Sequence, residues 1–335
     1  MLVLLSVKNL KMHYKTKMGY VRAVDSISFD LDSGEGLGIV GESGCGKTSV
    51  SMTILRLLPD NAEFKGGEVL FDNGNGEPVN LVSLAESEMR RYRWKGISMI
   101  FQAAMNSLNP VYKVGDQIVE AIQNHFPDTP TDVAKKKVAE LFRLVGLDPT
   151  RMEQYPHQYS GGMKQRAVIA MALSCDPRII IADEPTTALD VIVQDRILRE
   201  IRAIQKKLNM AMIYISHDIA VIAEVSDRIA VMYAGKFVEL ADSVTIFKRP
   251  MHPYTYGLMH AFPSVTGKKV DLVTIPGEPP DLLAPPRGCR FYPRCPKGDK
   301  LCEEKDPEYV EVDKGHFLAC HHPVQPGEVV QFNAE

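Results

Sequence analysis

The sequence lacks several features that would assign it to a class at once. Its 335 residues carry a formal net charge of only −3, so no bulk excess of positive charge is available for nucleic acid or anionic lipid. No apolar run approaches the roughly 18 residues of a membrane-spanning helix; the longest is Ala167 to Leu173. The apolar start, Met1 to Leu5, lacks a basic region and a small-residue cleavage site, so we expect no signal peptide. These absences predict a cytoplasmic protein that reaches a membrane only through a partner.

The last third of the chain has little capacity for long helices, because prolines crowd it after about residue 245. The chain also exceeds the length at which single cores stop growing. We therefore predict one large domain, residues 1–245, and a loop-rich C-terminal extension, residues 246–335. We find no internal repeat, so one nucleotide-binding unit per chain is expected.

Strand and helix patterns alternate before residue 245, which favours an α/β fold with a mostly parallel sheet. The predicted strands are 37–40, 66–71, 97–101, 178–182 and 211–215. The predicted helices are 47–58, 114–145, 160–174, 191–208 and 219–226. Residues 228–233 and 236–239 predict a hairpin around Ala234-Gly235. Between about residues 103 and 160 no strand pattern appears, so we predict a helical subdomain there.

A phosphate-binding loop stands between a predicted strand and a predicted helix. Residues 41–48, GESGCGKT, fit the pattern G-x-x-x-x-G-K-[ST] in the context that it requires. Its glycines let backbone N–H groups surround phosphate oxygens, and the helix N-terminus adds positive potential. We expect Lys47 to reach the β and γ phosphates and Thr48 to ligate Mg²⁺. The predicted ATP-binding residues are Tyr14, Gly41, Ser43, Gly44, Cys45, Gly46, Lys47, Thr48 and Ser49.

An aromatic ring upstream of the loop is a candidate for stacking on adenine. Tyr14 follows a strand and precedes a loop that contains lysine and glycine, and Tyr20 is a competitor. A half-buried strand aromatic is the alternative interpretation of Tyr14. Cys45 lies near a helix N-terminus and Lys47, which predicts a lowered thiol pKa.

Acidic and polar residues follow three other strands. Asp183 and Glu184 end an apolar strand, where Asp183 suits Mg²⁺ coordination and Glu184 suits removal of a proton from the attacking water. Gln102 follows the strand 97–101 and is expected to touch both Mg²⁺ and that water. His217 follows the strand 211–215 and is expected to donate to the γ phosphate. Each of these residues alone is ordinary, and only the combination indicates a catalytic site.

A second anion-binding helix start has no obvious phosphate from its own chain. Ser160, Gly161 and Gly162 form an N-cap and two bare backbone donors at the beginning of a helix. We expect these residues to meet the γ phosphate of ATP held by a partner, so that ATP joins two subunits and hydrolysis separates them.

Together these residues resemble the ATP-binding cassette family, in which they correspond to named motifs. Residues 41–48 resemble the Walker A loop, 179–184 Walker B with its catalytic glutamate, and Gln102 the Q-loop. Residues 159–166 resemble the signature, 188–190 the D-loop with Asp190, and His217 the switch histidine. The resemblance covers about residues 3–245 and implies ATP and Mg²⁺ as cofactors. Met163 stands where many signatures have Gln, and Cys45 where Ser is common, but neither removes a phosphate ligand.

A narrower resemblance is to the oligopeptide/dipeptide/nickel class of importer ATPases. It is carried by SLNP at 107–110, HPYT at 252–255, IPG at 275–277 and CRFYPRCP at 289–296. The class implies a second ATPase subunit, expected to be a paralogue in a heterodimer, two membrane permeases and an external solute-binding protein. It also implies a peripheral location at the cytoplasmic face of the membrane. The transported solute stays open between dipeptide, oligopeptide, nickel chelate and oligosaccharide.

The tail carries Cys289, Cys295, Cys302 and Cys320, a spacing that lacks the short C-x2-C pairs of most zinc sites. In a cytoplasmic chain such a cluster favours metal over disulfides. Spacing alone leaves zinc and an iron–sulfur cluster equally open, and the resemblance implies a [4Fe–4S] cluster.

The alternative functions for the whole chain are a DNA-repair ATPase head, which would carry a long coiled coil after Gln102, and a ribosome-associated factor, which would carry two tandem cassettes.

Overall fold

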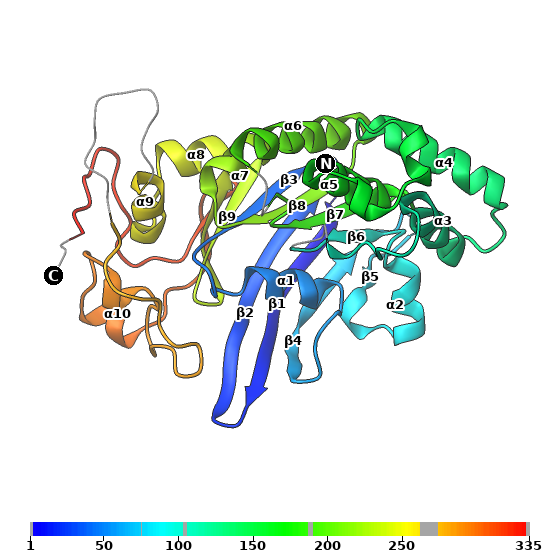
Figure 1. The fold of residues 1–335 in the computed structure, drawn as a ribbon. Coiled ribbons are helices and arrows are strands. Elements are labelled where there is room, and N and C mark those ends of the chain that lie inside the picture. Colours follow the sequence, from blue (N-terminus) through cyan, green and yellow to red (C-terminus); the bar gives the residue numbers. More distant parts are fainter. Residues whose placement is uncertain (1–2, 75, 103–105, 187–189, 262–273, 333–335) are drawn as a thin grey trace. The chain divides into compact units, whose positions relative to one another are not determined.

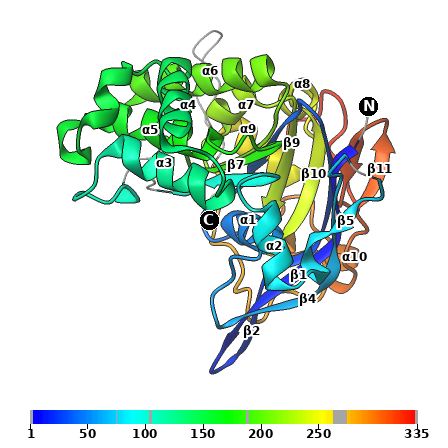
Figure 2. The same ribbon diagram turned by 90° about the vertical axis from the view of Figure 1, so that its right-hand side faces the viewer.

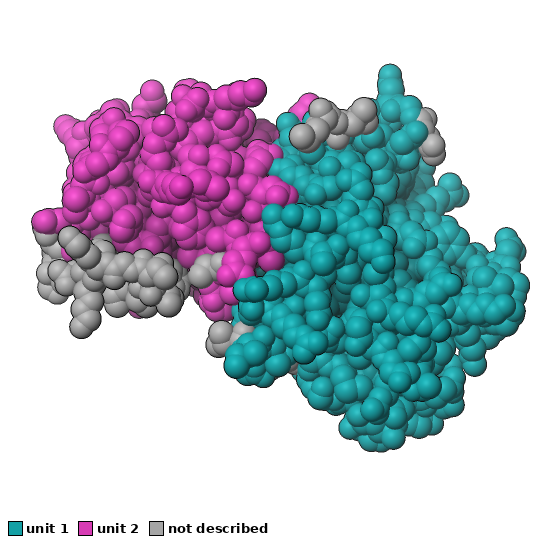
Figure 3. All heavy atoms as spheres, turned by 90° about the horizontal axis from the view of Figure 1, so that it is seen from above, with its two compact units in different colours: residues 1–5, 30–36, 70–215 teal, residues 6–29, 37–69, 216–335 magenta. Residues whose placement is uncertain are grey.

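The computed structural model describes residues 3–74, 76–102, 106–186, 190–261 and 274–332. Contacts between Cα atoms divide the chain into two compact units, shown in teal and magenta in Figure 3. Unit 1 comprises residues 1–5, 30–36 and 70–215, and unit 2 comprises residues 6–29, 37–69 and 216–335. The C-terminal extension is thus grouped with the phosphate loop, and the boundary at residue 245 stays a prediction.

Unit 1 contains a parallel three-stranded arrangement with adjacent helices. The three parallel strands are β6 (Ile97–Ile100), β7 (Ile179–Asp183) and most of β8 (Ala211–Ser216), and the unit also contains the short strand β5 (Val79–Asn80). β7 pairs in parallel with β6 and with β8, and every residue of β7 and β8 is buried. β5 pairs antiparallel with Leu70 and Phe71. The parallel strands confirm the α/β prediction for this half.

Unit 1 also contains a group of helices, and the helical subdomain expected at about residues 103–160 stays a prediction. The helices of this unit are α2 (Glu86–Tyr92), α3 (Val114–His125), α4 (Thr131–Leu144), α5 (Gly161–Leu173) and α6 (Val191–Leu208). Short 3₁₀ turns occupy Leu81–Ser83, Pro149–Glu153 and Pro156–Gln158. α3, α4 and α5 contact one another through buried apolar faces, and Figure 2 shows them gathered in green. The helix predicted at 114–145 is interrupted at residues 126–130, because Pro127 follows the end of α3 and cannot donate the backbone hydrogen bond that would continue the helix.

Unit 2 contains most of three long strands. β1 (Val3–Thr16), β2 (Gly19–Asp32) and β4 (Ala62–Phe71) are the long blue strands of Figure 1, in the order β2-β1-β4. β3 (Gly36–Val40) pairs in parallel with β9 (Arg228–Tyr233) and leads through the phosphate loop to α1 (Lys47–Ile54). β9 pairs antiparallel with β10 (Lys236–Asp242). Ala234 and Gly235 both have positive φ, as a two-residue hairpin turn requires, so the predicted hairpin is confirmed.

The extension adds strands that the sequence did not predict. β11 (Val310–Asp313) pairs with β12 (His316–Leu318), and β12 pairs antiparallel with β10. The remaining helices are α7 (Ile219–Val225), α8 (Ser243–Lys248), α9 (Pro253–His260) and α10 (Lys300–Glu304), with a 3₁₀ turn at Tyr292–Arg294. The described helices after residue 245 are short, as the prolines predict. Among the described residues, each helix is too short or too polar to span a lipid bilayer.

Candidate functional site

The phosphate loop of unit 2 adopts a conformation that only glycine allows at two positions. A Cβ on Gly41 would stand 2.1 Å from the Met232 carbonyl oxygen, and one on Gly46 would stand 2.0 Å from the Ala23 carbonyl oxygen. Both residues also have positive φ. The loop therefore packs its backbone against neighbouring strands while the Lys47 ammonium lies inside its curve, donating to the carbonyls of Gly41 at 2.7 Å and Glu42 at 3.0 Å. This cradle fits the phosphates of ATP.

The other predicted ATP-binding residues lie in the phosphate loop or next to it. Ser43 and Thr48 are exposed, whereas Ser49 is buried. The Tyr14 hydroxyl lies 3.0 Å from the Ser49 hydroxyl, so Tyr14 is tied to the first turn of α1. Tyr20 has Lys65 over its ring, with the ammonium 4.1 Å from the ring centroid. Tyr14 itself lies within β1 (Val3–Thr16) and does not follow it, and it is half-buried, as the alternative interpretation states; its stacking on adenine stays a prediction.

The prediction for the Cys45 thiol was wrong in direction. Cys45 is buried, and this desolvation raises its pKa even though the Lys47 ammonium, 3.9 Å from its sulfur, acts in the opposite sense. Burial dominates because a thiolate loses more hydration in this apolar position than the nearby cation returns.

Unit 1 brings Gln102 and Glu184 together. The Gln102 amide Nε2 donates to Glu184 Oε2 at 3.0 Å, across 82 residues of sequence. Glu184 has a φ of +46°, an uncommon value for a residue with a side chain, and its N–H donates to the Ile215 carbonyl at 2.8 Å. Asp183, directly before it, is buried at the end of β7. The carboxylate, amide and buried acid fit a Mg²⁺ and water site in chemical type.

Ser160 caps a helix of unit 1 as predicted, and Asp190, which was expected only as a D-loop residue, caps another. The Ser160 hydroxyl accepts from the Met163 N–H at 3.4 Å, and Ser160 and Gly161 are exposed at the start of α5. The Asp190 carboxylate accepts from the Val193 N–H at 3.0 Å at the start of α6. The other two residues of the predicted D-loop, 188 and 189, lie outside the described residues. In unit 2, His217 is exposed after β8 and precedes α7.

The four tail cysteines have free thiols and lie close enough to influence one another's charge. Burial, together with the nearby thiols of Cys289, Cys295 and Cys302, raises the pKa of Cys320 to about 12. Nearby backbone N–H groups lower each thiol pKa and partly offset burial; they belong to Phe291 and Tyr292 for Cys289, Lys297 for Cys295, Asp299 for Cys302 and His322 for Cys320. Four thiols with N–H donors in a low-polarity setting fit an iron–sulfur cluster, whose charge would overcome the raised pKa values.

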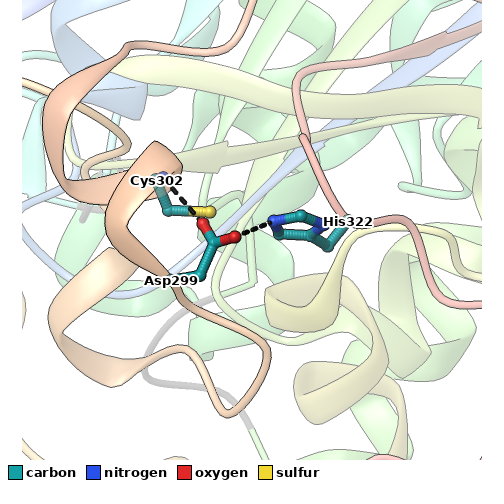
Figure 4. Close-up of side chains that lie close together, drawn as sticks. All are labelled: Asp299, Cys302 and His322. Carbon is teal, nitrogen blue, oxygen red and sulfur yellow. Dashed lines mark hydrogen bonds and ion pairs between the residues drawn. The ribbon is translucent and has the colours of Figure 1, made fainter.

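Sequence reasoning missed a mixed ligand set beside these thiols. Figure 4 shows Asp299, Cys302 and His322 turned toward one another, with ligand atoms within 4.8 Å. The His322 Nε2 atom lies 2.9 Å from Asp299 Oδ2, and Asp299 also caps α10. Nitrogen, oxygen and sulfur ligands of this kind suit zinc. The signal available in the sequence was His322 two residues after Cys320, and it carries little weight without coordinates.

A glycine cradle around a lysine, a buried strand ending in two acids, and a capped Ser-Gly-Gly helix start define a nucleotide-binding subunit of the ATP-binding cassette class. Known proteins agree. Residues 24–187 match the ABC transporter family, and residues 238–302 match the C-terminal region of oligopeptide/dipeptide transporters. The dimeric ATP-binding cassette MJ0796, solved in a post-hydrolysis state with ADP and Pi, superposes with a TM-score of 0.63 at 25% identity, over 71% of this chain and 98% of that one.

Curated relatives match almost end to end. The dipeptide transport ATP-binding protein DppD of Bacillus subtilis is 47% identical over 94% of this chain and 93% of its own length. The oligopeptide transport ATP-binding protein OppD of Escherichia coli is 42% identical over 96% of this chain and 94% of its own length. The chain therefore belongs to the ABC transporter family, in its oligopeptide/dipeptide class of ATPase subunits, and it is an ATP-hydrolysing enzyme.

Proposed function

We propose that this ATPase powers the import of dipeptides or oligopeptides. The observation that carries the proposal is the match to peptide-transport subunits over both the cassette and the extension. The test is uptake of labelled dipeptides and pentapeptides by cells that lack the chain and receive either the natural sequence or Lys47→Ala. Restored uptake by the natural sequence alone supports peptide import. Restored nickel uptake without peptide uptake would contradict it.

The roles of the residues follow from their chemistry. The backbone of residues 41–48 and Lys47 would hold the phosphates, Tyr14 the adenine, and Thr48, Asp183 and Gln102 the Mg²⁺. Bound Mg²⁺ neutralises phosphate charge during transfer. Glu184 would accept the proton of the attacking water, with Gln102 holding the carboxylate, and His217 would donate to the γ phosphate. This assignment uses every catalytic residue expected from the sequence.

We further propose that ATP is shared between two ATPase subunits. The exposed Ser160 and Gly161 at the start of α5 supply donors suited to a partner's γ phosphate. The similarity to a dimeric cassette supports this arrangement. The class suggests a paralogous partner, two permeases and an external solute-binding protein, with the chain peripheral at the cytoplasmic face of the membrane. Light scattering of Glu184→Gln with ATP tests it: the variant should associate with its partner subunit, and Ser160→Arg added to it should not.

The tail thiols would hold a [4Fe–4S] cluster through Cys289, Cys295, Cys302 and Cys320. The support is their free state, their mutual influence and the N–H donors at each sulfur. We assign the cluster a structural or regulatory role. Iron and sulfide analysis of anaerobically purified chain tests the assignment. A colourless preparation that contains only zinc would contradict it and favour Asp299, Cys302 and His322 as ligands.

A further inference from the structure

The segment between the first two tail cysteines contacts the phosphate loop directly. This cysteine loop, residues 289–295, contains Arg294, whose Nη1 donates to Glu42 Oε2 at 2.9 Å and whose Nη2 donates to Oε1 at 3.1 Å. Two parallel bonds to one carboxylate fix both its position and its orientation. The pair is mostly shielded from water, with side-chain exposures of 6% for Arg294 and 25% for Glu42, so it is not a solvent-screened surface contact.

Arg294 is itself held rigidly. Its Nε donates to the Pro276 carbonyl at 2.8 Å, and its Nη1 also lies 3.3 Å from the Tyr233 hydroxyl. Because its rotamer is already fixed by these contacts, the guanidinium loses little further freedom when it binds the carboxylate. Arg294 therefore acts as a fixed support rather than as a mobile surface side chain.

Glu42 links this support to the atoms that surround phosphate. Its carbonyl accepts from the Lys47 ammonium at 3.0 Å, and its N–H donates to the Tyr254 hydroxyl at 3.0 Å. Tyr254 in turn packs against Phe291 of the cysteine loop, with ring centroids 5.3 Å apart. The side chain, carbonyl and N–H of Glu42 are thus each engaged, two of them by the C-terminal extension.

A second arginine of the cysteine loop supports the hairpin turn that contacts the middle of the phosphate loop. Arg290 donates to the Ala234 carbonyl and pairs with Asp25. The next residue, Gly235, donates its N–H to the Cys45 carbonyl at 2.8 Å. The cysteine loop therefore contacts the beginning of the phosphate loop directly and reaches its middle through the turn at residues 234–235.

We propose that Arg294 is a positioning residue for ATP binding, which acts through Glu42 to hold the phosphate loop in its binding-competent conformation. Without Arg294, the shielded Glu42 carboxylate loses its partner and turns toward water, and its carbonyl moves away from Lys47. ATP then has to select the competent loop from a wider ensemble, and the apparent Kd rises in proportion to the lost population. The proposal does not depend on which metal the cysteines bind.

The test is ATP binding to the purified full-length chain, by calorimetry and without hydrolysis. Arg294→Gln and Glu42→Gln should each raise the Kd for ATP about tenfold, which is about 1.4 kcal/mol. The double variant should be no weaker than either single variant, because both remove the same contact. Arg249→Gln is the matched control: Arg249 pairs with Asp313 in the same unit, and both side chains are largely exposed, so its Kd should be unchanged.

Three further results separate positioning from plain stability. In steady-state assays Arg294→Gln should raise KM for ATP by the same factor and change kcat less. Arg294→Lys, which keeps the charge but loses the paired bonds, should give an intermediate Kd and also serves if Arg294→Gln does not fold. A Kd equal to that of the natural sequence in a variant with a lowered melting temperature, or additive effects in the double variant, would overturn the proposal.

Discussion

Replacing Glu184 with Gln should separate ATP binding from ATP hydrolysis. The amide oxygen of the new side chain can still accept the hydrogen bond that Gln102 Nε2 gives to Glu184 Oε2 at 3.0 Å. The backbone at φ +46° is as strained for Gln as for Glu, so the free energy of unfolding should change little. The substitution removes only the ability to accept a proton, while the shape of the side chain stays the same.

The expected loss follows from that single change. A positioned general base contributes about 10²- to 10⁴-fold to a rate, which corresponds to about 2.7–5.4 kcal/mol of activation free energy. We expect kcat for phosphate release to fall by this factor while the Kd for ATP stays within about twofold, a difference below 0.5 kcal/mol. The loss should not be recovered at high ATP concentration, because binding is intact.

The assay is phosphate release by the chain copurified with its transport partners, together with equilibrium binding of a fluorescent ATP analogue. Glu120→Gln is the control, because Glu120 is an exposed acid on α3 of the same unit. A kcat for Glu184→Gln within about threefold of the natural enzyme, less than 1 kcal/mol, would refute the assignment of Glu184 as base.

Three more predictions concern other parts of the chain. Burial lowers the pKa of His252 to about 4, whereas the unfolded imidazole binds a proton below about pH 6.5. The contribution of His252 to the free energy of unfolding should therefore be fully present above pH 6.5 and should be lost as the pH drops toward 4. His252→Asn, which can still cap the Tyr254 N–H, should flatten urea-unfolding free energies in that window. Cys295→Ser should lose bound iron and visible absorbance and bind ATP more weakly, whereas Cys175→Ser should keep both; retained iron in Cys295→Ser would contradict the ligand set. Cys45 should react with iodoacetamide at pH 7 far more slowly than a free thiol does, since burial raises its pKa; a rate equal to that of the unfolded chain would contradict this.

The sequence was sufficient to predict those parts of the candidate site whose conformation depends on residues close together in the chain. The glycines and lysine of 41–48, the acids after 178–182 and the Ser-Gly-Gly helix start each combine a local backbone requirement with a fixed spacing. The conformations of Gly41 and Gly46 and the Ser160 cap follow directly from those requirements. Even the contact of Gln102 with Glu184 follows from parallel strands that end at one edge.

The sequence was insufficient where the outcome depends on burial or on distant partners. Cys45 has a nearby lysine, and only the coordinates show that desolvation outweighs it. Arg294 stands beside a cysteine in a proline-rich segment, and no local pattern indicates a partner 252 residues away. β12 was missed because three residues carry no reliable period, and its pairing with β10 supplies the stability that its length lacks.

The long separation between Glu42 and Arg294 has a consequence for biosynthesis. A ribosome that adds about 5–20 residues per second needs roughly 13–50 s to pass from one to the other. Throughout that interval the emerging polypeptide carries its Walker A segment without the arginine that steadies it. Under the coupling proposed above, a nascent chain that has not yet reached Arg294 would bind cellular ATP with weakened affinity, which would discourage ATP-driven association with a partner subunit during that interval.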